Sequence, residues 1–177
     1  MSDGFDGFET FDPASGLPPM RSARCTALVE YWNALRGSRP FPSRDEIDPA
    51  AIKALLPHIM MTSIEHDPFR VFYRLVGTEI VRFAKFDFTN CYADSLRFQD
   101  TEGADWADFY RIVVEEARRP GLGLSYWIVA GNLQRWIEFV ICPLSSDGQV
   151  IDRCIAVEDY EHLNIVEIDT LPPVSTQ

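Results

Sequence analysis

The stretch that decides the fold is Arg70–Ala84, with the sequence RVFYRLVGTEIVRFA. Its first half, residues 71–76, is rich in aromatic and β-branched residues, which is typical of a β-strand. Gly77 ends this run, and Thr78 is expected to cap a short helix over 78–84, whose apolar residues have helical spacing. A strand that turns directly into a helix predicts a junction between a sheet and an element that covers its face.

Immediately before this stretch, the sequence predicts a partner strand. Residues 59–65, IMMTSIE, have the composition of a strand, and His66-Asp67-Pro68 supplies a turn after them. We therefore expect the two strands to pair as an antiparallel hairpin.

Two helices are predicted further towards the N-terminus. Ser22 to Arg36 carries an apolar stripe at helical spacing, and Gly37 follows it as a C-terminal glycine. The stripe consists of Leu28, Tyr31, Trp32 and Leu35. Asp48-Pro49 is typical of the start of a second helix, which Pro57 would end.

The C-terminal side predicts one longer helix and three more strands. Apolar residues at helical spacing indicate a helix over 104–118. Strand-like runs follow at 122–129, 133–144 and 150–159. Asp147-Gly148 predicts a tight hairpin turn between the last two strands.

The register of that last hairpin determines which side chains share a face. A two-residue turn would place Val140 opposite Ile155 and Phe139 opposite Ala156, with the two pairs on opposite faces. Both faces are then apolar, and both need cover. We therefore predict an α+β fold with a five-stranded antiparallel sheet and a helical crossover on one face. The N-terminal helices, a second subunit, or both would cover the other face.

Composition limits the class of protein. The chain has 177 residues, which suits one domain with extensions, and a formal net charge of -11. This excess of acid argues against binding to nucleic acid or to an anionic membrane surface. Its 4 cysteines are widely spaced without a Cys-x-x-Cys pair, so no metal site is expected. No apolar run has membrane-spanning length, and the acidic N-terminus is unlike a secretion signal. We expect a cytoplasmic protein with reduced thiols.

The block Phe72–Val81, FYRLVGTEIV, is similar to the PAS domain, and the chain most resembles the single-domain PAS family common in alphaproteobacteria. The family's continuation is matched by Asp87-Phe88-Thr89, then Tyr92 and Leu96, while the Trp32 helix and Leu55-Leu56-Pro57 fit upstream. The resemblance covers about residues 25–160. A glycine usually follows the threonine in this family, and here the residue is Asn90, which tolerates positive φ.

PAS domains are sensing and protein-interaction modules, and some hold a small molecule between the sheet and its helices. The resemblance implies signalling, and it names no ligand. With the composition along the chain, we predict a flexible acidic tail over 1–20, N-terminal helices over 21–57, a PAS core over 58–160 and a C-terminal tail over 161–177.

A ligand pocket between sheet and helices would be lined by aromatic residues. The candidates are Phe72, Phe83, Trp127, Trp136 and Phe139. Because aromatic side chains fill cores more often than they line pockets, a filled core is the alternative to an open cavity.

Neither haem nor flavin is expected, and the cofactor stays unknown. The crossover helix over 104–118 has no histidine, and surface or capping positions are expected for His58, His66 and His162. The segment Thr89-Asn90-Cys91-Tyr92 is similar to the Asn-Cys pair of light-sensing LOV domains. However, its cysteine falls about two positions early, and the surrounding Arg and Gln pattern is missing.

No catalytic motif is present, so we do not expect an enzyme. The sequence lacks a GxSxG elbow, a phosphate-binding loop and an HExxH motif. The enzymatic alternative is an α+β fold of the ketosteroid-isomerase type, with Glu138 or Asp159 as a buried general base. That fold needs a longer, more curved sheet, and Glu138 is otherwise expected to be exposed at an edge or end of the sheet.

The sequence therefore predicts a regulatory domain with no attached output domain, acting on an unidentified protein partner and controlled, in one version, by a small ligand. A ligand-free scaffold or dimerisation module is the alternative. The surplus of apolar faces predicts a homodimer, for which the contact residues would be Leu28, Tyr31, Trp32 and Leu35.

Overall fold

The computed structural model describes residues 7–96, 106–129 and 133–160, and for 126–129 and 133–135 it describes the backbone alone. Its strands are β1 (Phe8–Thr10), β2 (Ile59–His66), β3 (Phe69–Val76), β4 (Gly121–Val129), β5 (Leu133–Leu144) and β6 (Arg153–Asp159). Its α-helices are α1 (Ala23–Arg36), α2 (Thr78–Ala84) and α3 (Trp106–Arg111). Short 3-10 turns lie at Pro13–Ser15, Arg44–Glu46, Leu56–His58 and Ala93–Ser95. The predicted α+β class is confirmed.

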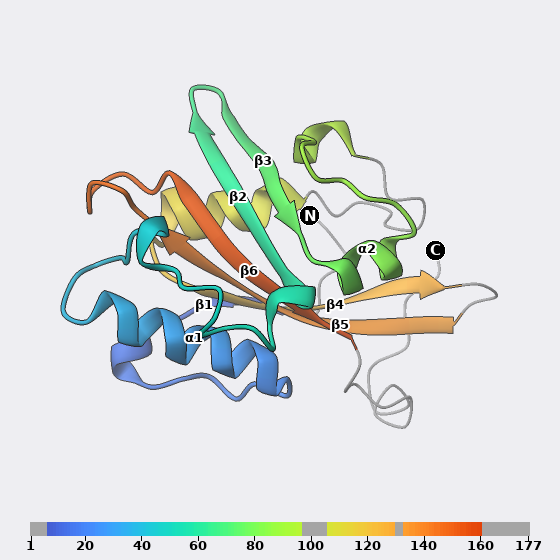
Figure 1. Cartoon of the computed structure of the whole chain (residues 1–177), viewed down its shortest axis with the longest axis horizontal. Coiled ribbons are helices and arrows are strands. Elements are labelled where there is room, and N and C mark those ends of the chain that lie inside the picture. Colours follow the sequence, from blue (N-terminus) through green and yellow to red (C-terminus); the bar gives the residue numbers. More distant parts are fainter. Residues whose placement is uncertain (1–6, 97–105, 130–132, 161–177) are drawn as a thin grey trace.

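The strands form one antiparallel sheet in the order β1-β4-β5-β6-β2-β3 (Figure 1). Five of these strands, β2 to β6, are the ones that the sequence predicts. The sixth, β1, pairs with β4 and comes from the stretch expected to be a flexible tail, so that expectation is wrong here. The Phe8 ring explains the difference, because it packs 4.7 Å from the Phe109 ring and 6.0 Å from the Phe139 ring, measured between centroids. This apolar contact offsets the entropy lost on ordering the segment.

The stretch Arg70–Ala84 forms most of β3 and all of α2, and the predicted β2–β3 hairpin is confirmed. The N-cap of α2 is Gly77 rather than Thr78, and it makes no side-chain cap. Gly77 is required for a different reason. Its N–H donates to the carbonyl of Ile59 at 2.8 Å, and a Cβ added there would lie 2.2 Å from the carbonyl oxygen of Pro57. Two backbone segments therefore touch at this position, which leaves no space for a side chain.

The β5–β6 hairpin has a different register from the predicted one. Val140 lies opposite Val157, and Phe139 lies opposite Glu158. The connection is longer than two residues because Asp147 folds it into a loop, accepting from the N–H groups of Gln149 at 2.8 Å and Val150 at 2.7 Å. Since the register differs by an even number of residues, each side chain keeps its predicted face, while its cross-strand neighbour changes.

Helix α1 covers one face of the sheet, over β5 and β6. Its N-cap is Ser22, whose hydroxyl accepts from the N–H groups of Arg24 and Cys25 at 3.1 Å. Trp32 is buried on its inner side, and the indole N–H donates to the carbonyl of Pro143 at 2.7 Å. The apolar face left open in the sequence analysis is thus covered by the chain's own helix.

The second predicted helix, over 48–57, is wrong. The backbone makes successive three-residue turns there, with bonds such as Ala51 N–H to the Asp48 carbonyl at 3.1 Å and Leu55 N–H to the Ile52 carbonyl at 2.8 Å. Pro49 and Pro57 lie at the two ends of the segment. Pro49, at the start, is compatible with a helix, but Pro57 has no N–H to donate to the carbonyl of Lys53, so the last turn cannot close in the α-helical pattern.

The opposite face carries the helical crossover that the sequence predicts. Helix α3 continues as a π-helix over Ile112–Glu116, where the Ala117 N–H donates to the carbonyl of Ile112 at 2.8 Å. The predicted helix over 104–118 is therefore correct in place for its described part, but it changes its hydrogen-bond pattern after Arg111. In Figure 1 this helix, in yellow, passes behind β2 and β6, while α1, in blue, lies on the other side. Within the described ranges, no helix is long and apolar enough to cross a membrane.

Candidate functional site

A pocket lies on the crossover face of the sheet, between the central strands, α2 and α3. It is lined by Met60, Tyr73, Ile80, Phe83, Ala84, Phe88, Trp106 and Glu158. These residues come from β2, β3, α2, the segment after α2, α3 and β6. Seven of the eight are apolar or aromatic, so the single carboxyl dominates the polarity of the pocket.

Glu158 is a buried acid with no partner among the residues that the structure describes. It lies near the end of β6, and its side chain is only 8% exposed. Among the described residues, none donates a hydrogen bond to this carboxyl or pairs with it as an ion. Burial raises its pKa from 4.5 to about 7, because the charged form loses its hydration and gains nothing in return. Buried carboxyls normally have partners, so this one is available to a bound molecule.

The aromatic lining is held in place by ring contacts. Tyr73 and Phe88 meet edge to face with centroids 4.9 Å apart. Phe83 stacks on Tyr160 with centroids 4.2 Å apart, and the Tyr160 hydroxyl donates to the backbone carbonyl of Glu79. Contacts of this kind fix ring orientation as well as adding apolar burial. These contacts set the orientation of the rings in the pocket wall.

The pocket is narrow. It contains about 300 Å³ of empty space when its open mouth is included, but only about 10 Å³ is available to the centre of a water molecule. That enclosed space holds about one water. The half-buried side chains of Phe83 and Ala84 on α2 line it, so a larger ligand requires α2 or its side chains to move.

Of the five predicted lining residues, the structure places one in the pocket. Phe83 lines it. Phe72 lies half-buried beside Tyr92, with ring centroids 4.8 Å apart. Trp136 and Phe139 are buried elsewhere in the core, and the Trp127 side chain is outside the described part. Phe139 fills space beside Gly123, where an added Cβ would lie 2.1 Å from its ring.

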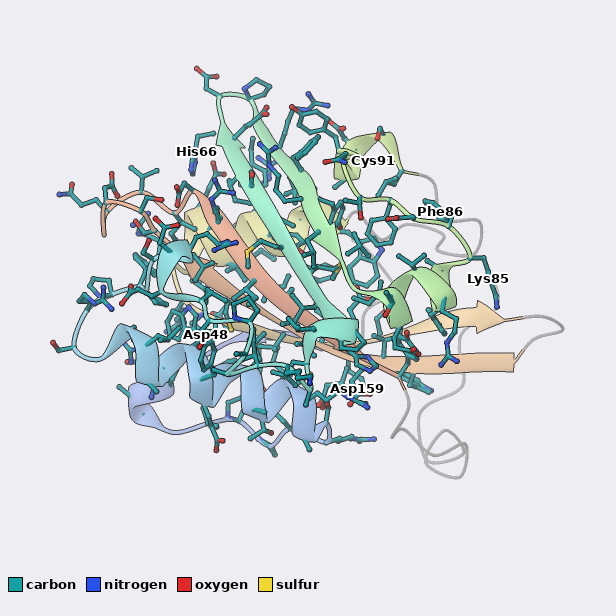
Figure 2. The ribbon with its side chains drawn as sticks, viewed as in Figure 1. Asp48, His66, Lys85, Phe86, Cys91 and Asp159 are labelled. Atoms are coloured by element: carbon teal, nitrogen blue, oxygen red, sulfur yellow. The ribbon has the colours of Figure 1, made fainter. Side chains whose placement is uncertain are left out.

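Glu138 and Asp159, the two candidate general bases, lie on the face that α1 covers. Glu138 is buried rather than exposed, and its two oxygens accept from the backbone N–H groups of Arg21 at 2.9 Å and Ser22 at 2.6 Å. Asp159 accepts from the Ser22 hydroxyl at 2.6 Å and from Arg24 at 2.9 Å. Figure 2 shows Asp159 near the start of α1. Both carboxyls therefore anchor the first turn of this helix.

Two of the four residues predicted to contact a second copy are instead buried within the chain itself. Leu28 is fully buried and Trp32 is 2% exposed, so neither is available to a second copy. Tyr31 and Leu35 are half-buried, and the Tyr31 hydroxyl accepts from the backbone N–H of Asp48 at 2.8 Å. Homodimer formation itself stays a prediction.

The cysteines and histidines form no site. Cys91 is half-buried beside β3 and does not line the pocket, while burial raises the pKa of the Cys25 and Cys154 thiols. His58 is buried rather than at the surface, and His66 lies at the end of β2 beside the turn. No group of three metal-ligating side chains occurs among the described residues. His162 lies outside them.

Sequence reasoning missed the acid that the pocket contains. Glu158 follows Ala156 by two residues in a strand, so strand alternation puts both on the same face as Phe139. The sequence therefore contained a signal for this site, because Glu158 is a charged residue in an otherwise apolar strand and alternation places it on the crossover face.

A comparison with models of protein families matches residues 20–150 to the PAS domain. Among solved structures, one match is the light state of the LOV domain of the blue-light photoreceptor Aureochrome1, with 12% identity and a TM-score of 0.44 over 68% of this chain and 92% of the other. A second is an RNA-binding light-oxygen-voltage receptor, with 10% identity and a TM-score of 0.49 over 88% of this chain. The chain spans 38% of that receptor's length. A search of curated proteins found no match.

Proposed function

The chain belongs to the PAS domain family, and from this premise we propose a sensory or regulatory domain that binds a small molecule in the pocket between the sheet, α2 and α3. Occupancy of the pocket would control an interaction with a partner protein in signal transduction. The family supports the signalling role. The observation that supports ligand binding is Glu158, a buried and unpartnered carboxyl on an otherwise apolar pocket wall.

The structure gives no reason to propose catalysis. Glu138 and Asp159, the carboxyls that would serve as a general base, are each committed to two hydrogen bonds with the start of α1. Among the described residues of the lining, Glu158 has no base, nucleophile or second acid beside it. Binding therefore accounts for this arrangement better than turnover does.

Native mass spectrometry of the freshly purified full chain, with a near-ultraviolet and visible absorption spectrum of the same sample, tests this proposal. We expect a mass above that of the polypeptide, with one small molecule per chain that is released on unfolding. The absorption spectrum identifies a conjugated ligand directly. A bare polypeptide mass, with no thermal stabilisation by any member of a small-molecule library, would count against ligand binding.

A ligand-free interaction module is the second candidate, and the narrowness of the pocket favours it. Space for about one water needs no ligand to fill it. A bare dimer mass in the same experiment would support this candidate, and the partner search would then start from the protein surface.

A further inference from the structure

We propose that the pocket recognises a small organic cation, an alkylammonium ion whose N–H group donates to Glu158 and whose methyl groups contact the surrounding aromatic rings. This inference rests on the proposed function, because it names the chemical class of the ligand for the same pocket. It follows from three features of the lining, which are its one charged group, its ring content and its size.

The first feature is the carboxyl. Glu158 offers two acceptor oxygens, and no described side chain or backbone group donates to them. An unpaired carboxylate in an apolar site is stabilised most by a partner that brings both a positive charge and a hydrogen-bond donor. An anionic ligand would be repelled by this carboxylate, since the described part of the lining contains no lysine, arginine or histidine to compensate the charge.

The second feature is the aromatic content. Tyr73, Phe83, Phe88 and Trp106 form half of the lining and come from four different segments of the chain. Aromatic faces attract cations through the ring quadrupole, and cages of such rings bind methylated ammonium groups. A carboxylate combined with several rings therefore suits an ammonium ion better than a neutral apolar molecule. A neutral apolar molecule would cover the carboxyl without giving it a hydrogen bond or an opposite charge, which is unfavourable.

The third feature is the limited space. An enclosed volume that holds about one water excludes a large planar cofactor unless the walls move. A methylated ammonium ion is smaller, so the pocket walls would have to move far less to admit it. The residues that would move are Phe83 and Ala84 on α2, which are half-buried.

Titration calorimetry on the full chain tests the inference with three probes of similar shape. Trimethylammonium carries charge and an N–H donor, tetramethylammonium carries charge alone, and tert-butanol is neutral. A control titration uses sodium chloride in place of the probe salts at the same ionic strength. It measures the weak, non-specific attraction of any cation to a chain with a net charge of -11. We expect saturable binding of trimethylammonium with one site per chain, weaker binding of tetramethylammonium, and the weakest binding of tert-butanol.

The variant Glu158→Gln keeps the size of the side chain and removes its charge. We expect it to weaken trimethylammonium at least tenfold at pH 8 and to leave tert-butanol unchanged. The matched control is Glu30→Gln, since Glu30 is exposed on α1, away from the pocket, and its loss removes the same overall charge. This control should bind trimethylammonium as the wild type does.

The wild type provides a second test that needs no variant. The pKa of Glu158, raised to about 7 by burial, means that the carboxyl is mostly protonated at pH 6 and mostly ionised at pH 8. Trimethylammonium should therefore bind about tenfold more tightly at pH 8. Among the described residues, the other titratable groups near this carboxyl are Tyr73 in the lining, the buried Tyr110 of α3 and the buried Cys25 of α1. Burial raises the pKa of both Tyr110 and Cys25 above its ordinary value, so neither of these two groups titrates between pH 6 and pH 8.

Two results would overturn the inference and leave the proposed function standing. The first is tert-butanol binding as tightly as trimethylammonium, and the second is trimethylammonium binding that neither Glu158→Gln nor pH alters. Failure of all three probes while native mass spectrometry shows a bound molecule would also overturn the inference alone. Failure of the probes together with a bare polypeptide mass would overturn both.

Discussion

The unpartnered carboxyl of Glu158 should lower the stability of the empty protein, and replacing it should raise that stability. In the folded chain its pKa is about 7, and in the unfolded chain the carboxyl is hydrated, with its ordinary value of 4.5. Below about pH 4.5 both states hold the proton, so the group contributes no penalty. Between pH 4.5 and 7 the unfolded chain releases its proton while the folded chain retains it. Stability therefore falls as the pH rises through this window.

The magnitude follows from the two pKa values. A difference of about 2.5 pKa units, at about 1.4 kcal/mol each, corresponds to a full penalty of about 3 kcal/mol above pH 7. Glu158→Gln carries no titrating proton and keeps the shape of the side chain. Its free energy of unfolding should thus exceed that of the wild type by about 3 kcal/mol at pH 8, and by less than about 1 kcal/mol at pH 5.

Urea unfolding at pH 5 and pH 8, followed by tryptophan fluorescence, measures this difference without any ligand. Other groups also titrate, so the informative quantity is the difference between variant and wild type at each pH. Glu30→Gln, on the exposed side of α1, is the control and should show no such change between the two pH values. A Glu158→Gln advantage that is equal at pH 5 and pH 8, or absent at both, would refute the assignment of a buried, unpaired carboxyl.

Three further predictions concern the backbone and the anchor of α1. Gly77→Ala should destabilise the fold by about 2 kcal/mol or more in urea unfolding, because its Cβ would lie 2.2 Å from the Pro57 carbonyl oxygen; a loss below about 0.5 kcal/mol would contradict this contact. Glu138→Ala should cost about 2–4 kcal/mol and speed hydrogen exchange at Ser22, whose buried N–H loses its acceptor; unchanged exchange there would exclude the anchor. Asn90 has a φ of 66°, so Asn90→Gly should be close to neutral while Asn90→Ala costs about 1 kcal/mol; equal stabilities would contradict the left-handed backbone.

Local sequence patterns were sufficient for most of the sheet. Strand-like composition and a short turn predicted the β2–β3 hairpin, and both strands of the last hairpin were placed within a few residues. Strand β1 could not be found in this way. Its three residues, Phe8–Thr10, gain their order from β4 and from ring contacts far along the chain, and a local pattern contains no information about such contacts.

The register error changed the cross-strand neighbour of Glu158 but not the face of the sheet on which it lies. The turn at Asp147-Gly148 was taken as two residues long, which put Ala156 opposite Phe139. The loop held by the Asp147 carboxyl lengthens the connection and brings Glu158 to that place instead. Aromatic residues were also expected to mark the pocket, but three of the four whose side chains are described lie outside its lining. The sequence shows which residues are apolar. Only the packing of the folded chain determines which aromatic rings fill the core and which of them line a pocket.

The order of the last two residues of β6 gives the sheet a short internal connection. Glu158 and Asp159 are neighbours in the chain, and strand alternation directs the first into the pocket and the second to the start of α1. Under the proposed function, a ligand bound to Glu158 would act on a peptide unit that belongs also to the anchor of α1. The pocket on one face and the start of α1 on the other are thus linked by two consecutive residues, Glu158 and Asp159. A change at one face would then reach the other through the backbone, without a chain of side-chain contacts through the core.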